Sequence, residues 1–216
     1  MTILFDLDGT LIDSTEAILE SFHRSFRLLG GKTPDDGAIR ALIGHPLDHM
    51  YRDLGVDPEK VDAYVQTYKE HYRVISREKT VLLPGAREAI EAAAAFARLG
   101  IVTTKTARYS RELMEHFGVM DAFEVLVGRE DVEHPKPHPE PVRRAMEKMR
   151  ADAAECWLIG DTRLDAGAAR AAGIGCVGVL SGYDREEDLR PLTPHIKADA
   201  LEAVRFLGRK GRNVTF

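Results

Sequence analysis

The sequence lacks long hydrophobic runs, closely spaced cysteines and an excess of positive charge. No apolar run in the 216 residues approaches the roughly 18 needed to cross a bilayer, and the first residues lack the basic-then-apolar order of a secretory signal. The two cysteines, Cys156 and Cys176, lie in or beside separate apolar runs, which favours reduced packing residues over a disulfide or metal site. The net charge of -5 disfavours nucleic acid and anionic membranes as partners. We therefore expect a cytoplasmic protein with neither partner.

Short apolar, strand-like runs alternate with helical patterns along most of the chain. The composition, 44% hydrophobic and 30% charged, is typical of a globular protein with a substantial core. The runs are ILF after the N-terminus, then IVTT, FEVLVG, CWLIGD and GCVGVL, followed by a weaker final strand. Such alternation predicts an α/β, Rossmann-like parallel sheet with helices on both faces.

One stretch interrupts the alternation because it shows helical patterns only. It begins where Ser14 can cap a helix that runs to about Leu29, and it includes a stripe formed by Val61, Tyr64, Val65, Tyr68 and Tyr72. We expect residues 14–81 to form an inserted helical cap, and residues 1–13 and 82–216 to form an α/β catalytic core. Within that core, the Ala-rich residues 87–100 predict a helix closed by Gly100.

Polar residues follow the predicted strands where each one ends. Asp6 and Asp8 follow the first strand, and Asp161 and Asp165 follow CWLIG. Thr103 to Lys105 end IVTTK, and Lys136 lies in the loop HPKPHPEP after FEVLVG. The carboxyl ends of parallel strands meet at one edge, so these residues are expected to converge on one site.

In order along the chain, DLDGTLIDS, TTK, HPKPHPEP and GDTRLD together resemble the four motifs of the haloacid dehalogenase-like hydrolases. The similarity covers nearly the whole chain and is to the capped phosphatase branch, close to phosphoglycolate phosphatases. The resemblance implies a phosphoric monoester hydrolase that uses Mg²⁺ and a covalent aspartyl-phosphate.

The resemblance also implies roles for the acids. Asp6 matches the nucleophile, and Asp8 matches the general acid that protonates the leaving group and then deprotonates water. Mg²⁺ would be held by the carboxylate of Asp6, by Asp161 and by the backbone carbonyl of Asp8. Asp165 would be a further ligand or a partner of the ligands. The alternative for Asp8 is a plain turn former before Gly9.

Phosphate contacts are implied in the same way. Thr103 matches a hydroxyl that binds a phosphate oxygen, helped by the amides of Leu7 and Thr104, and Lys136 would neutralise the charge of Asp6 and the phosphoryl group. The alternatives are a β-branched strand residue for Thr103 and a solvated loop lysine for Lys136. Relatives often carry Asn where this chain has Thr104, so a shorter hydroxyl replaces a side-chain amide. This difference leaves the identity of the substrate undetermined.

The cap implies a small phosphorylated metabolite as substrate, because a closing cap leaves little space above the phosphate. Gly44 and His45, in LIGHPLDHMY, match the place where relatives present a loop to the leaving group, although His45 can equally be a surface residue. Phosphoglycolate is the favoured substrate. Hydrolysis of inorganic pyrophosphate and a sugar-phosphate phosphatase or phosphomutase are alternatives, as is a non-catalytic phosphate-binding module. The chain is expected to be a monomer or a homodimer.

Overall fold

A six-stranded parallel sheet forms the centre of the larger of two units in the computed structural model, which describes residues 1–212. The strands lie in the order β5 (Phe123–Val127), β4 (Arg98–Val102), β1 (Thr2–Phe5), β6 (Cys156–Gly160), β7 (Gly175–Val179) and β8 (Ile196–Lys197). Every neighbouring pair runs parallel. The first strand of the chain is therefore central, and the predicted α/β parallel sheet is confirmed.

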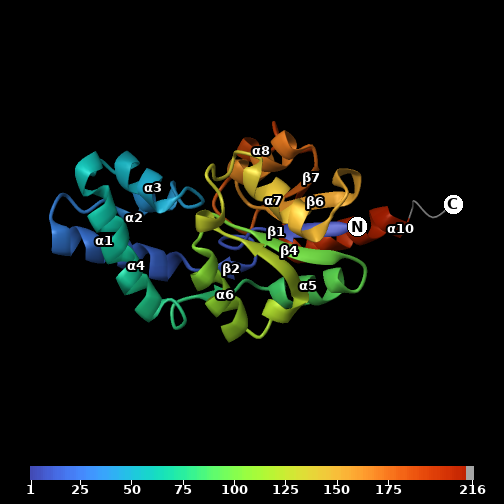
Figure 1. Cartoon of the computed structure of the whole chain (residues 1–216), viewed down its shortest axis with the longest axis horizontal. Coiled ribbons are helices and arrows are strands. Elements are labelled where there is room, and N and C mark those ends of the chain that lie inside the picture. The colour runs from blue at the N-terminus through green and yellow to red at the C-terminus, as the bar shows by residue number, and fades with distance from the viewer. Residues whose placement is uncertain (213–216) are drawn as a thin grey trace. The chain divides into compact units, whose positions relative to one another are not determined.

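Side chains of β1 point alternately into two hydrophobic clusters, one on each face of the sheet. Ile3 and Phe5 belong to the cluster that includes α5 (Ala86–Ala94), α6 (Ala107–His116) and α10 (Ala200–Arg212). Leu4 belongs to the cluster that includes α7 (Glu140–Met149) and α8 (Arg163–Ala172). The sheet is thus covered by helices on both faces, as Figure 1 shows. The remaining short helices of this unit are η2 (Met120–Ala122), η3 (Arg129–Asp131), η4 (Ala153–Glu155) and α9 (Glu186–Leu189).

The expectation that Gly100 closes the Ala-rich helix is wrong. Helix α5 already ends at Ala94, and Gly100 lies inside β4, paired with Leu4 and Val125. A Cβ at Gly100 would stand 2.8 Å from Leu4 Cδ2 and 2.9 Å from Val125 Cγ2. Glycine is present here because neighbouring side chains occupy the space above the strand, not because a helix ends.

The state of the cysteines and the length of the helices bear on the expected lack of disulfides and membrane spans. Cys156 and Cys176 are both buried free thiols, and burial raises the pKa of each. Among the described residues, no helix has both the length and the apolar character needed to span a membrane.

The second unit, Asp13–Val81, is helical and has its own aromatic core. Its helices are α1 (Thr15–Leu29), α2 (Asp36–Arg40), α3 (Leu47–Asp53), η1 (Pro58–Lys60) and α4 (Val61–Ile75). The boundaries of the unit fall inside β2 (Ile12–Asp13) and β3 (Val81–Leu82), which form a separate two-stranded sheet.

Aromatic rings on α1, α3 and α4 hold this unit together. Phe22 packs against Tyr51 and Tyr68, with ring centroids 4.6 and 5.1 Å away. The buried hydroxyl groups of Ser25 and Tyr51 form a hydrogen bond of 2.7 Å, which satisfies both of them inside the core. In the predicted stripe, Val61 and three tyrosines are buried, whereas Val65 is half-buried.

The predicted capping role of Ser14 is only partly right. Ser14 is the residue before α1, but its side chain makes no capping hydrogen bond. The Asp13 carboxylate instead accepts the Thr15 amide hydrogen at 2.9 Å. An acidic side chain one residue earlier thus satisfies a donor of the first turn.

Candidate functional site

Three buried carboxylates meet at the carboxyl edge of the sheet. Asp6 follows β1, Asp161 follows β6, and Asp165 lies in the first turn of α8. Because β1 and β6 are adjacent, the Asp6 amide donates to the Ile159 carbonyl at 2.9 Å and keeps the two strand ends side by side. Each of the three acids offers an oxygen, and these oxygens lie within 4.8 Å of one another. The structure thus brings together three of the residues that the sequence predicts as metal ligands.

Lys136 is buried among these acids, so it is not a solvated loop lysine. Its ammonium donates to Asp6 Oδ1 at 2.8 Å, to Asp165 Oδ1 at 2.5 Å and to the Val102 carbonyl at 3.1 Å. Only 3% of the residue is exposed. Burial alone would lower the pKa of Lys136, but the charges of Asp165 and Asp6 outweigh it and raise that pKa above its ordinary value. The side chain therefore stays cationic.

The cluster still has more negative than positive charge, since three carboxylates share one buried ammonium. Burial raises the pKa of the Asp6 carboxyl to about 7, although Lys136 opposes the shift. Burial and the charges of Asp165 and Asp6 raise the pKa of Asp161 well above its usual value. A divalent cation suits this site, because it supplies the missing charge and prefers oxygen ligands.

The carboxylate of Asp161 is fixed by two donors from other parts of the chain. Thr10 Oγ1 donates to Asp161 Oδ1 at 3.0 Å, and the Tyr183 amide donates to Asp161 Oδ2 at 2.9 Å. Gly9 permits a close approach, because a Cβ there would stand 2.3 Å from Asp161 Oδ2. Its φ of +83° also favours glycine. The DGT part of the first motif therefore positions the acid that follows β6.

Both oxygens of Asp165 are already engaged within the protein. Oδ1 accepts from Lys136, and Oδ2 accepts from the Thr162 hydroxyl at 2.6 Å and the Thr162 amide at 3.1 Å. The bond from the Thr162 amide is one half of a capping box at the start of α8, whose other half is the Asp165 amide donating to the Thr162 side chain. Asp165 therefore orients Lys136 and the loop before α8, and its role toward a metal ion stays a prediction.

The other residues predicted for the site in the core lie just after β1 and β4. Lys105 Nζ lies 3.1 Å from Asp8 Oδ2. The expected role of Asp8 as a general acid stays a prediction. Thr103 is 4% exposed, and its Oγ1 accepts the Lys105 amide hydrogen at 3.1 Å. Thr104 is half-buried beside it. Leu7 is fully buried, and its carbonyl accepts the Leu11 amide hydrogen at 2.8 Å.

The matching family model spans residues 3–179 and is described as haloacid dehalogenase-like hydrolase. The chain belongs to this family. Membership confirms the resemblance drawn from the four motifs and identifies the protein as a hydrolase.

Relatives of this hydrolase differ in their named substrates. A pyrophosphatase, PpaX of Halalkalibacterium halodurans, is 34% identical over 214 residues and covers 98% of each chain. A phosphoglycolate phosphatase of Colwellia psychrerythraea is 30% identical over 202 residues, or 89% of each chain. A haloacid dehalogenase-like hydrolase from Bacteroides fragilis has a solved structure that matches with a TM-score of 0.89 at 28% identity. That match covers 94% of this chain and 98% of the other.

Two contributors to the site of this hydrolase were missed in the sequence, because Thr10 and the Tyr183 amide hold Asp161. Lys105 was expected at this edge of the sheet, but its pairing with Asp8 was not predicted. Thr10 stands inside the first motif, so its polarity beside the acids was an available signal. Tyr183 contributes only a backbone amide, for which residue type gives no signal.

Gly44 and His45 lie in the helical unit, so their predicted contact with a leaving group stays a prediction. Gly44 has a φ of +107°. The half-buried His45 ring stacks on His49, with centroids 4.9 Å apart.

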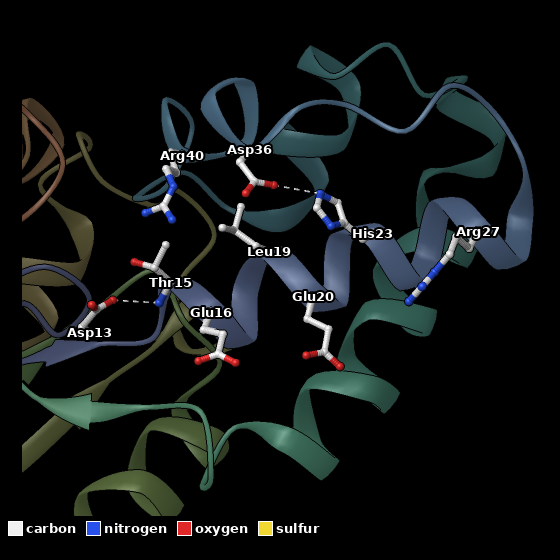
Figure 2. A pocket seen from close by; sticks show the side chains of 9 residues that line it. All are labelled: Asp13, Thr15, Glu16, Leu19, Glu20, His23, Arg27, Asp36 and Arg40. Carbon is white, nitrogen blue, oxygen red and sulfur yellow. Dashed lines mark hydrogen bonds and ion pairs between the residues drawn. The ribbon is translucent and has the colours of Figure 1, made fainter.

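The helical unit also contains an open hollow of about 600 Å³ beside α1 and α2, drawn in Figure 2. Its lining carries both signs of charge, including Glu16, Glu20, Asp36, Arg27 and Arg40. His23 Nε2 lies 3.1 Å from Asp36 Oδ1 across part of it. Mixed charge of this kind does not by itself select an anionic ligand.

Proposed function

We propose that this hydrolase is a Mg²⁺-dependent phosphatase that cleaves a small organic phosphate monoester, with phosphoglycolate as the favoured substrate. The observation that carries the proposal is the buried group of Asp6, Asp161 and Asp165 around Lys136 at the end of the central strand. A bound Mg²⁺ would neutralise charge between a carboxylate and a phosphate dianion and so permit the two to approach.

Asp6 is the proposed nucleophile because its carboxylate is buried, anchored through one oxygen and placed at a strand end. Lys136 holds Oδ1, which restrains the orientation of the carboxylate group. An Asp6 oxygen forms a bond to phosphorus while the bond from phosphorus to the leaving oxygen breaks, and an aspartyl-phosphate results.

Asp8 is the proposed general acid and base. Its carboxyl group donates a proton to the departing oxygen, and the resulting carboxylate then takes a proton from the water that attacks phosphorus. The second step breaks the bond between Asp6 and phosphorus and releases inorganic phosphate. Lys105, 3.1 Å from Asp8 Oδ2, keeps the group in place for both transfers.

Phosphate oxygens are proposed to bind to donors at the ends of β1 and β4. Thr103 supplies a hydroxyl, and the Leu7 and Thr104 amides supply backbone donors. The bond that Thr103 Oγ1 accepts from the Lys105 amide orients the hydroxyl. Gly44 and His45 are proposed to contact the leaving group from the cap.

Inorganic pyrophosphate is the second candidate substrate, favoured by the similarity to a pyrophosphatase along almost the whole chain. Its leaving group is a phosphate, so the same nucleophile and general acid would serve. The choice between the two depends on cap residues that contact the leaving group.

A panel of small phosphates tests the proposal. Phosphoglycolate, pyrophosphate, glucose 6-phosphate and glucose 1-phosphate are compared with Mg²⁺ and with a chelator, and products are identified. We expect free phosphate, Mg²⁺ dependence and a preference for phosphoglycolate. Preference for pyrophosphate would favour the second candidate, and conversion of the 1-phosphate to the 6-phosphate would indicate a mutase. Activity that survives Asp6→Asn would refute the proposed nucleophile.

A further inference from the structure

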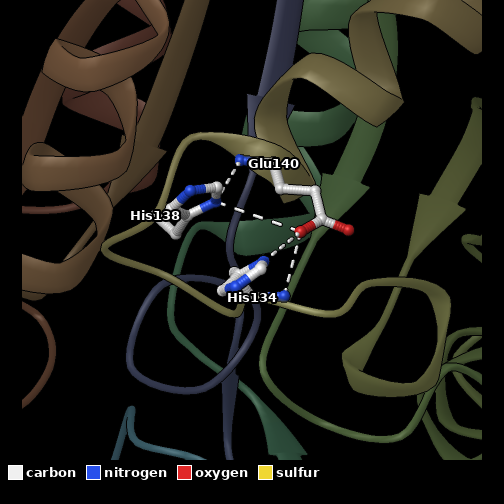
Figure 3. A group of neighbouring side chains, drawn as sticks. All are labelled: His134, His138 and Glu140. Carbon is white, nitrogen blue, oxygen red and sulfur yellow. Dashed lines mark hydrogen bonds and ion pairs between the residues drawn. The ribbon is translucent and has the colours of Figure 1, made fainter.

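Two histidines and a glutamate gather around the loop that carries Lys136, outside the acidic site. His134 and His138 stand on either side of Lys136, and Glu140 is the first residue of α7. The turn that brings them together is closed by the His138 amide, which donates to the Pro135 carbonyl at 3.0 Å. Figure 3 shows both rings lying beside the carboxylate.

The spacing of these three side chains is close to that of a tetrahedral metal site. His134 Nδ1 lies 3.1 Å and His138 Nδ1 4.0 Å from Glu140 Oε2. One ligand atom from each residue lies within 4.8 Å of the others. Zinc bound to nitrogen and oxygen at about 2.0–2.1 Å places neighbouring ligand atoms roughly 3.3 Å apart in a tetrahedron. Small side-chain movements would therefore bring these three ligand atoms to the spacing that zinc requires.

The glutamate is already oriented and charged. Its Oε1 accepts the Glu133 amide hydrogen at 2.8 Å, and its Oε2 accepts the His134 amide hydrogen at 2.9 Å. Two backbone donors on its oxygens favour the carboxylate form of Glu140, which is the form that binds a metal ion. Backbone bonds of this kind fix a ligand in the way that outer partners fix the ligands of metal sites.

The histidines are accessible, and one ring nitrogen is directed at the glutamate. His134 and His138 side chains are 57% and 49% exposed. The Glu140 amide donates to His138 Nδ1 at 3.2 Å, so that nitrogen is the unprotonated one, and an ion bound there would replace the amide bond. An ion can reach the group from solvent and keep water as its remaining ligand.

We propose that His134, His138 and Glu140 form a binding site for a divalent transition-metal ion such as Zn²⁺. Two imidazoles and one carboxylate suit zinc and its neighbours, whereas magnesium and calcium prefer ligands that are all oxygen. The site is separate from the buried acids, which offer oxygen alone. Because Lys136 lies midway between the two histidines, an ion bound here would tie down the loop that places its ammonium on Asp6.

Calorimetry with Zn²⁺ tests the site without reference to catalysis. The full chain is freed of metal by chelation, supplied with excess Mg²⁺ to compete at the acidic site, and titrated with Zn²⁺. We expect His134→Ala and His138→Ala each to weaken Zn²⁺ binding by at least about tenfold. Their exposed side chains can be removed without disturbing the core, and circular dichroism checks that the fold is kept.

His49→Ala is the matched control. His49 is also exposed and also pairs with a carboxylate, since its Nδ1 lies 3.2 Å from Asp53 Oδ2. Zn²⁺ affinity should not change in this variant. Unchanged affinity in the His134→Ala/His138→Ala double variant, or an equal loss in His49→Ala, would overturn the proposal.

Co²⁺ gives a second readout that needs no variant. Tetrahedral Co²⁺ absorbs far more strongly in the visible than octahedral Co²⁺ does, so the wild-type chain in excess Mg²⁺ should develop the tetrahedral bands. Zn²⁺ should then remove them by displacement. A titration that yields only the weak octahedral spectrum would contradict the site.

Discussion

Lys105 Nζ lies 3.1 Å from Asp8 Oδ2, and the two side chains are only 9% and 13% exposed. An ion pair shielded from water in this way holds the carboxylate in one orientation more firmly than a solvated pair would. Lys105→Met should therefore lower kcat by about 10- to 100-fold, within the range set by general acid and base catalysis.

Lys105→Arg should recover part of this loss, because it restores a cation beside Asp8. Lys148→Met, at an exposed position on α7, is the control and should keep wild-type kcat. Steady-state kinetics of all three variants decide the matter. Equal kcat in Lys105→Met and wild type would show that the ion pair has no part in catalysis.

Gly9→Ala and Gly55→Ala separate backbone strain from steric conflict. Their φ angles, +83° and +84°, are nearly the same, so an added Cβ costs about 1–2 kcal/mol of strain at either position. At Gly55 nothing lies within 4 Å of that Cβ, whereas at Gly9 it would stand 2.3 Å from Asp161 Oδ2. Gly9→Ala should therefore lose more unfolding free energy and nearly all activity, while Gly55→Ala keeps its activity. Similar losses in both variants would argue against close packing at Asp161.

Thr10→Val removes the hydroxyl that donates to Asp161 and preserves the shape of the side chain. Loss of a donor that orients a metal ligand should weaken Mg²⁺ activation by about 10- to 100-fold. The Mg²⁺ concentration needed for half-maximal activity is the measurement.

Thr80→Val is the control for the same chemical change. Among the described residues, Thr80 Oγ1 is the buried side-chain atom that lacks a hydrogen-bond partner. Its removal should leave Mg²⁺ activation unchanged and stability equal or slightly higher, since no bond is lost. If the two valine variants need the same Mg²⁺ concentration, the hydroxyl of Thr10 does not orient Asp161.

Without metal, the free energy of unfolding should fall as pH rises through the neutral range. The pKa of Asp6 is raised to about 7 in the folded chain, and that of Asp161 is also raised, so between about pH 4 and 7 the folded state binds more protons than the unfolded state. The extra protons stabilise the fold below this range, and their contribution is lost above it. The proposed divalent cation would take their place at higher pH.

The rise in Tm caused by Mg²⁺ should thus be larger near pH 8 than near pH 5. Thermal melts at both pH values, with Mg²⁺ and with a chelator, provide the comparison. Asp161→Asn should reduce the difference, because it removes one of the carboxyl groups whose raised pKa underlies it. An effect of Mg²⁺ that is the same at both pH values would contradict the raised pKa values.

The sheet and the group of buried acids were predictable because they depend on short sequence patterns that each indicate a strand or its end. Each buried strand is a short apolar run, and parallel strands bring Asp6 and Asp161 to one edge whatever the details of packing. Gly100 was misread because a glycine after an Ala-rich helix is a common helix terminator. The crowding by Leu4 and Val125 that explains it exists only once the strands have paired.

The finer contacts of the site could not be predicted for a similar reason. Whether Lys105 points toward Asp8, or the Tyr183 amide toward Asp161, depends on loop conformations that bring distant segments together. Residue type sets what a side chain can do, and the folded loops decide which partner it meets.

The central place of β1 has a consequence for synthesis on the ribosome. Its two neighbours are β4 and β6, so the first strand to emerge must wait until Cys156–Gly160 has been made before both of its edges are paired. Asp6 and Lys136 are 130 positions apart, and closing so long a loop is slow. The proposed nucleophile Asp6 therefore gains its buried partner Lys136 only after residue 136 has been made, and the second edge of β1 is paired later still.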